Sequence, residues 1–184
     1  MTSDSSAEPT RRDFLYVATG AVAAVGAGLA AWPFIAQMNP SSAVRALASI
    51  EVDISSVVVG QAITVMWRGH PVFIRRRTAK EIAEARAVNV ADLPDPDSRN
   101  ANLPDGSPAT DANREIKPEW LVLVGVCTHL GCTPTGFEGE FGGWLCHCHG
   151  SQYDTAGRIR KGPAPQNLAV PTYSYLSPTR LKIG

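Results

Sequence analysis

Residues 127–132 read Cys-Thr-His-Leu-Gly-Cys, and residues 145–151 read Leu-Cys-His-Cys-His-Gly-Ser. The two stretches hold all four cysteines and three of the four histidines of this 184-residue chain. Thiolates and imidazoles are the side chains that bind zinc and iron–sulfur clusters. The pattern therefore predicts a metal centre held between two loops, with more candidate ligands than one small site needs.

The spacing of the inner residues admits two kinds of centre. Cys127-x-His129 is followed, after sixteen residues, by Cys146-x-x-His149. Two thiolates and two imidazoles bind either a tetrahedral structural zinc or a [2Fe–2S] cluster with two cysteines on one iron and two histidines on the other. Zinc fingers usually pair like ligands within one arm, whereas each arm here provides one cysteine and one histidine. The spacing favours the cluster and leaves zinc as the alternative.

An uncharged segment near the N-terminus predicts a membrane anchor. No charged residue lies between Asp13 and Arg45, and residues 14–38 are mostly apolar. A helix of that length crosses a hydrocarbon core of about 30 Å. Arg11–Arg12 directly precedes it, in the pattern of a twin-arginine export signal, and the positive-inside rule keeps that end cytoplasmic. The alternatives are a signal cleaved at a small-residue site and a buried core helix.

The predicted organisation is therefore a cytoplasmic N-terminus (1–13), a transmembrane anchor (14–38), a linker (39–49) and one exported domain (50–184). The linker contains Pro40 and small polar residues, and we interpret it either as a plain surface linker or as a flexible hinge.

The net charge of the chain is zero, because the 17 basic and 17 acidic residues balance. This balance gives no reason to expect nucleic acid as a partner.

Alternating apolar residues predict a mainly β domain. We expect one helix at 79–87, a long surface loop at 91–119 with five prolines, and a turn at 69–71 in which His70 has no catalytic role. Arg75–Arg77 is expected to be a solvated strand end, with a docking patch as the alternative. The predicted strands are 62–67, 72–75, 121–126, 144–145, 168–170 and 181–183.

Both motifs resemble the two ligand boxes of the Rieske iron–sulfur proteins. The similarity extends through Tyr153–Asp154, the run 156–161 and Gly162-Pro163-Ala164-Pro165, and it includes the N-terminal Arg-Arg-Asp-Phe-Leu-Tyr and the strand 71–77. Over nearly its whole length the chain resembles the Rieske subunits of bacterial ubiquinol–cytochrome c reductase, the cytochrome bc1 complex. The resemblance implies a mainly β fold: a single N-terminal transmembrane helix plus an antiparallel β-sandwich head with a cluster-binding subdomain.

Residue roles follow from the resemblance by position. It implies one Rieske [2Fe–2S] cluster, held by loops 127–132 and 146–151, and a disulfide that joins those loops. Cys127 and Cys146 are implied to bind one iron, and His129 and His149 the other. Cys132 and Cys148 are implied to form the disulfide. The resemblance further implies that Ser151 and Tyr153 tune the cluster by hydrogen bonds, that Leu130 and Pro163 shield it, and that His149 contacts quinol.

Two positions depart from the family pattern. His147 stands where the family usually has proline, and Gln152 stands where respiratory members often have histidine. His147 is itself a potential ligand. Because His149 keeps its register before Gly150–Ser151, we assign the ligand role to His149 and expect His147 to point outward.

The resemblance implies an electron-transfer subunit that accepts one electron, with a proton, from ubiquinol and passes it to cytochrome c1, contributing to proton translocation. The implied partners are cytochrome b, cytochrome c1 and ubiquinol in a dimeric complex of the bacterial inner membrane, active only when assembled, with the head on the periplasmic side. The alternatives are the small Rieske subunit of an exported oxidoreductase such as arsenite oxidase, a soluble Rieske ferredoxin and a zinc-binding interaction module. The 91–119 loop and the 71–77 strand argue against the arsenite oxidase alternative.

Overall fold

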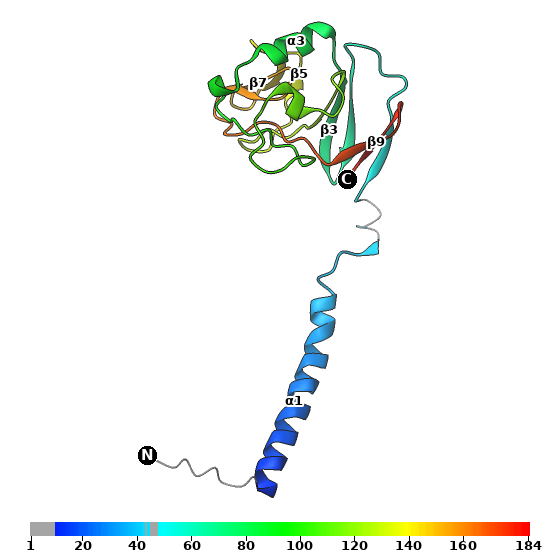
Figure 1. The fold of residues 1–184 in the computed structure, drawn as a ribbon, viewed down its shortest axis with the longest axis vertical. Helices are drawn as coiled ribbons and strands as arrows, with labels where there is room; N and C mark the ends of the chain where they lie inside the picture. The colour runs from blue at the N-terminus through cyan, green and yellow to red at the C-terminus, as the bar shows by residue number, and fades with distance from the viewer. Residues whose placement is uncertain (1–9, 43, 45–47) are drawn as a thin grey trace, which may run out of the picture. The chain divides into compact units, whose positions relative to one another are not determined.

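The computed structural model describes residues 10–42, 44 and 48–184. The chain divides into two compact units, Met1–Arg45 and Ala46–Gly184. The first contains helix α1 (Arg11–Ala36), drawn in blue in Figure 1, and the second is a head of short strands with helix α3 (Ala79–Ala87). The predicted fold class, mainly β with one N-terminal apolar helix, is confirmed.

Helix α1 begins with a capping box. The Thr10 hydroxyl accepts a hydrogen bond from the Asp13 amide at 3.3 Å, and the Asp13 carboxylate accepts one from the Thr10 amide at 2.9 Å. This cap places Arg11, Arg12 and Asp13 in the first turn, so the helix starts three residues before the predicted anchor and ends two residues before Met38.

Within the described residues, α1 is the one helix long and apolar enough to cross a membrane, with a mean hydropathy of 1.8. Its 26 residues span about 39 Å, and none is buried. Residues 1–9 of the predicted cytoplasmic segment, and residues 43 and 45–47 of the predicted 39–49 hinge, lie outside the described residues. The proposed roles of both segments stay predictions.

Three antiparallel sheets form the head. Their strand orders are β1-β10-β9, β2-β3-β4 and β5-β6-β7-β8. The strands are β1 (Ile50–Asp53), β2 (Ala62–Trp67), β3 (His70–Arg76), β4 (Trp120–Val124), β5 (Thr135–Gly136), β6 (Gly142–Cys146), β7 (Ser151–Asp154), β8 (Ile159–Lys161), β9 (Tyr173–Ser177) and β10 (Arg180–Ile183).

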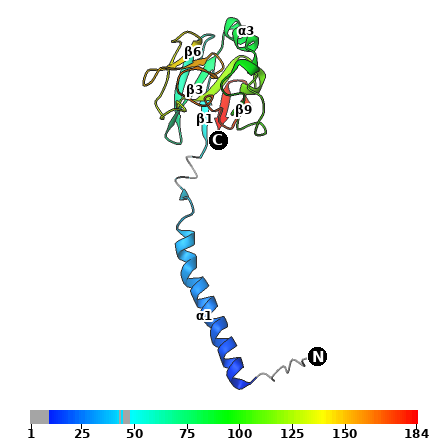
Figure 2. The ribbon, with the colours of Figure 1, turned by 90° about the vertical axis from the view of Figure 1, so that its left-hand side faces the viewer.

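One hydrophobic core joins the three sheets. It includes Leu181 of β10, Ile74 of β3 and Trp144 of β6, each at most 2% exposed. Phe73 of β3 stacks on Trp144 with ring centroids 6.1 Å apart, and β3 and β6 lie beside each other in Figure 2. The third sheet, which carries the second cysteine–histidine loop, is thereby fixed to the rest of the head.

The β2–β3 hairpin turns one position earlier than predicted. Arg68 and Gly69 occupy the left-handed region, with φ of 49° and 77°, as a two-residue hairpin turn requires. His70 therefore pairs with Trp67 as the first residue of β3.

The expectation of a solvated strand end at Arg75–Arg77 is wrong. Arg75 is 5% exposed and Arg77 is 2% exposed. Arg77 donates to the Asp111 carboxylate at 2.5 Å and to the Pro118 carbonyl oxygen at 2.6 Å, while Arg75 forms an ion pair with Glu81. A buried guanidinium is tolerated when its donors are paired in this way.

The segment 91–119 is not simply a surface loop. It contains the end of the short helix η1 (Val90–Asp92) and all of η2 (Asp111–Arg114). Arg114 is fully buried and donates to four backbone carbonyl oxygens outside the helix, those of Ser98, Ala156, Gly157 and Leu168. These bonds fasten the segment to the residues that follow β7.

The predicted strand at 168–170 is not one of the strands of the head. The Val124 amide donates a hydrogen bond to the Ala169 carbonyl oxygen. The Val170 amide donates to the Arg99 carbonyl oxygen, and Val170 forms an isolated parallel bridge with Asn100. The C-terminal hairpin β9–β10 includes a strand that the sequence analysis missed, in which Tyr173 is buried and Ser174 is exposed.

Candidate metal centre

The two cysteine–histidine loops follow strands β4 and β6. The first begins three residues after β4 and folds back on itself, with the Cys127 amide donating to the Cys132 carbonyl oxygen at 2.7 Å. The second joins β6 to β7, and the Gly150 amide donates to the Cys146 carbonyl oxygen at 2.9 Å. Both loops contain a glycine with positive φ, Gly131 at 80° and Gly150 at 76°.

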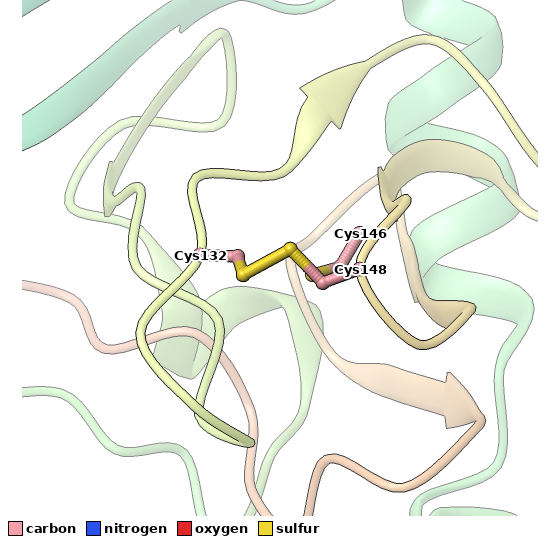
Figure 3. A group of neighbouring side chains, drawn as sticks. All are labelled: Cys132, Cys146 and Cys148. Atoms are coloured by element: carbon pink, nitrogen blue, oxygen red, sulfur yellow. A yellow bond between two sulfur atoms is a disulfide. The ribbon is translucent and has the colours of Figure 1, made fainter.

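A disulfide joins the two loops. Cys132 and Cys148 are bonded, with their Cα atoms 6.8 Å apart, as the resemblance implied (Figure 3). Together with the Cys146 sulfur, these atoms form a group in which all three sulfurs lie within 4.8 Å of one another. Because two of them are consumed by the disulfide, Cys146 is the member of this group that remains free to bind a metal.

The free cysteines and the histidines differ in exposure. Cys127 and Cys146 are each 2% exposed. His149 is exposed, whereas His129 is partly buried, and their rings meet edge to face with centroids 4.6 Å apart. The site therefore has a thiol side in the protein interior and an imidazole side toward solvent.

The side chains present fit a Rieske cluster. The Nδ1 atom of His129 is buried without a hydrogen-bond partner, a state that costs about 1–3 kcal/mol and that a bond to iron would offset. Burial opposes ionisation of the Cys127 thiol, but hydrogen bonds, first among them that from Tyr153, outweigh it and lower the pKa of Cys127. A lowered thiol pKa favours the thiolate that binds iron.

Tyr153 lies directly against the thiol side. Its hydroxyl donates to the Cys127 sulfur at 3.3 Å and accepts from the Thr128 amide at 3.3 Å. Burial raises the pKa of Tyr153, so the phenol keeps its proton and remains a donor. Ser151 is also among the hydrogen-bonding groups that lower the pKa of Cys127.

The proline-bearing loop 162–165 covers Ser151. The Ala164 amide donates to the Ser151 hydroxyl at 3.1 Å, and a Cβ on Gly162 would lie 2.6 Å from the Ser151 Cα. Pro163, the residue predicted to shield the cluster, is exposed, whereas Ala164 is buried. Gly162 and Ala164 are therefore site residues that the sequence analysis named only as part of the loop.

Thr128 connects the same loop region to the first ligand loop. Its hydroxyl donates to the Gln166 carbonyl oxygen at 2.7 Å, and the Gln166 amide donates back at 3.3 Å. Thr128 was not predicted to have a role in the site. Its place between Cys127 and His129, inside the Cys-x-His box, was the available signal.

The two departures from the family pattern both contact the segment 138–140. His147, 60% exposed, points outward as predicted, and its Nε2 lies 2.6 Å from the Glu138 carboxylate. The Gln152 side-chain oxygen accepts a hydrogen bond from the Glu140 amide at 2.7 Å.

Leu130, the predicted shielding residue next to His129 in sequence, is 70% exposed. An apolar side chain therefore lies at the solvent side of the site.

Comparisons with known proteins agree on one family. The family profile described as "Ubiquitinol-cytochrome C reductase Fe-S subunit TAT signal" matches residues 1–41, and the Rieske [2Fe-2S] domain profile matches residues 84–174. The ubiquinol-cytochrome c reductase iron-sulfur subunit of Bradyrhizobium diazoefficiens is 56% identical over 100% of both chains. Those of Blastochloris viridis (54% identity, 100% of this chain and 98% of the relative) and Cereibacter sphaeroides (56%, 95% of each) are similar.

These matches exclude the zinc and arsenite oxidase alternatives. The export-signal match together with helix α1 makes the chain a membrane-anchored, exported subunit of an oxidoreductase. The chain belongs to the ubiquinol–cytochrome c reductase iron–sulfur subunits, which transfer electrons through a Rieske [2Fe–2S] cluster in the cytochrome bc1 complex.

Proposed function

We propose that this chain takes one electron and one proton from ubiquinol at His149 and passes the electron to cytochrome c1. Cys127 and Cys146 would bind the inner iron, and His129 and His149 the outer one. When bound, a Rieske cluster supplies a one-electron acceptor whose potential is raised because neutral imidazoles replace two thiolates. The observation that carries the proposal is the asymmetry of the site: both free thiols are buried, whereas His149 is exposed.

His149 would bind the substrate directly. The ring nitrogen that does not bind iron accepts a hydrogen bond from a quinol hydroxyl and holds the proton after the electron has left. Leu130, 70% exposed, would contribute apolar surface around that hydrogen bond and keep water from it. Tyr153 and Ser151 act on the opposite, buried side through their hydrogen bonds near Cys127.

The remaining chain would deliver the head to its partners. We place the head on the periplasmic side, because Arg11 and Arg12 lie in the first turn of α1 and the positive-inside rule keeps that end cytoplasmic. The 39–49 segment would act as the hinge that lets the head contact cytochrome b when it binds quinol and cytochrome c1 when it releases the electron. Turnover would require the assembled, dimeric complex, since the chain supplies only one of these three electron carriers.

Leu130 allows the quinol contact to be tested without removing a ligand. Full-length Leu130→Asn is assembled into bc1-containing membranes, and quinol–cytochrome c turnover is measured beside the Rieske EPR signal. Losing the burial of one leucine costs roughly 1.5 kcal/mol, so turnover should fall about tenfold while the signal amplitude is unchanged.

Leu176→Asn on β9 is the matched control, because Leu176 is also exposed, at 50%, but belongs to a sheet without ligand residues. It should leave turnover unchanged. Equal turnover in both variants and the unsubstituted chain would contradict docking through the exposed tip.

A further inference from the structure

The Cys146 thiol lies beside the disulfide that joins the two ligand loops. In Figure 3 its side chain runs next to that of Cys148, and its sulfur is within 4.8 Å of both disulfide sulfurs. Cys146 is 2% exposed, so reagents from solvent reach this thiol poorly. The proximity brings a nucleophile to a bond that it can cleave.

A free thiol at this distance makes thiol–disulfide exchange an intramolecular reaction. The Cys146 sulfur attacks the Cys132 sulfur, a Cys132–Cys146 bond forms, and the Cys132–Cys148 bond breaks. The bonding pair leaves with Cys148, which takes up a proton equivalent to the one that Cys146 released. One disulfide and one thiol are present before and after, so no external oxidant or reductant is consumed.

The attack on Cys132 is favoured over the attack on Cys148. A Cys146–Cys148 bridge would enclose a single residue, His147, within the turn that the bond from the Gly150 amide to the Cys146 carbonyl oxygen closes. A Cys132–Cys146 bridge still joins the two ligand loops. The expected product is therefore Cys132–Cys146 with Cys148 as the free thiol.

We infer that iron ligation of Cys146 protects the native Cys132–Cys148 pairing, and that the cluster-free head is a thiol–disulfide exchange site. The inference rests on the proposed assignment of Cys146 as a ligand, because a sulfur bound to iron is not available as a nucleophile. It also sets an order of maturation: the cluster must be in place before the disulfide forms, or the wrong pair forms in part of the chains.

Cys127→Ser gives a direct test, because it removes one proposed ligand but leaves the three clustered cysteines. The full-length variant is purified in detergent, treated with iodoacetamide under native conditions and mapped by peptide mass spectrometry. One disulfide and one free thiol remain. Label should accumulate on Cys148, which is exposed, in several-fold excess over label on Cys146, and a Cys132–Cys146 peptide pair should appear.

The double variant Cys127→Ser/Cys146→Ser is the matched control, since it also lacks the cluster but has no attacking thiol. It should keep Cys132–Cys148 and take up no label. The unsubstituted chain with its cluster should likewise show no label on Cys148. An intact native disulfide in Cys127→Ser, with no label or with label confined to Cys146, would overturn the inference.

The absorbance spectrum of Cys127→Ser distinguishes failure of the exchange inference from failure of the proposed ligand assignment. If Cys127→Ser retains a Rieske absorbance spectrum, the ligand assignment fails, and the inference that rests on it is overturned whatever the labelling shows. If the variant does not accumulate as a folded chain, the unsubstituted chain is stripped of iron anaerobically with a chelator and labelled in the same way. Label on Cys148 after stripping supports exchange, and its absence contradicts exchange.

Discussion

The hydroxyl of Tyr153 donates a hydrogen bond to the sulfur of Cys127 over 3.3 Å, and the tyrosine side chain is fully buried. A buried donor of this kind stabilises negative charge on the sulfur, and that charge increases when an electron is added. Through this bond, a residue of the hydrophobic core is expected to influence the reduction potential of the site.

Tyr153→Phe should lower the midpoint potential of the cluster. The phenylalanine keeps the packing but removes the donor, and a loss of roughly 1 kcal/mol of preference for the reduced state corresponds to about 40 mV for one electron. A redox titration followed by EPR measures the shift. Tyr175→Phe is the control, because the Tyr175 hydroxyl has no partner and lies in a different sheet. Equal potentials in all three proteins would contradict a tuning role.

Gly162→Ala should disturb the loop that covers Ser151. The new Cβ would lie 2.6 Å from the Ser151 Cα, at a φ of +102°, so the loop must move away. We expect a lower yield of cluster-loaded chain and earlier cluster loss on heating, followed by absorbance. Gly106→Ala separates strain from collision, because Gly106 also has positive φ, +78°, but open space around its Cβ position. Similar cluster loss in both variants would assign the effect to backbone strain alone.

Glu115 should make the stability of the head depend on pH. Burial, more than any neighbouring charge, raises the pKa of Glu115 from 4.5 to about 7. Since the folded-state pKa lies above the unfolded one, this group's contribution is fully present below about pH 4.5 and is lost as the pH rises through 7. Glu115→Gln should therefore raise the unfolding temperature at pH 8.5 by a few degrees relative to the unsubstituted chain, an effect on the order of 1 kcal/mol.

Thermal unfolding followed by circular dichroism at pH 5 and pH 8.5 measures this effect. Glu119→Gln provides the matched control, since Glu119 is an exposed carboxylate four residues along the chain. A Glu115→Gln difference that is the same at both pH values would show that the carboxyl group does not titrate in this range.

Stiffening the linker should slow electron delivery without changing the cluster. Ser42→Pro combined with Val44→Pro restricts the backbone between α1 and the head, so we expect several-fold lower quinol–cytochrome c turnover with an unaltered EPR signal. Ser42→Gly combined with Val44→Gly changes the same positions toward flexibility and should keep turnover. Full turnover in the proline variant would favour a passive linker.

Features carried by residues close in sequence were the easiest to predict. The 79–87 helix with its Thr78–Glu81 capping box follows from a short pattern. The Cys132–Cys148 pairing and the outward position of His147 were implied by the resemblance to the two family boxes, and the structure has both. The assignment of His149 as a ligand rests on the same resemblance and stays a prediction.

The errors came from long-range pairing. Arg77 looks like a solvated residue in sequence, but its partner Asp111 lies 34 positions away, and the pairing is what makes its burial favourable. Arg114 is buried for the same reason, since its acceptors at Ala156 and Leu168 come from a distant part of the chain. Polar residues at 91–119 therefore predicted a surface loop where the head has a buried network.

The EPR spectrum of the reduced, full-length chain in membranes shows directly which metal centre the two loops hold. We expect the low-average-g signal of a Rieske [2Fe–2S] cluster. Cys146→Ser and His149→Ala should each abolish this signal, whereas Leu176→Asn should not. An EPR-silent chain that contains stoichiometric zinc would contradict the assignment of Cys127, His129, Cys146 and His149 as iron ligands.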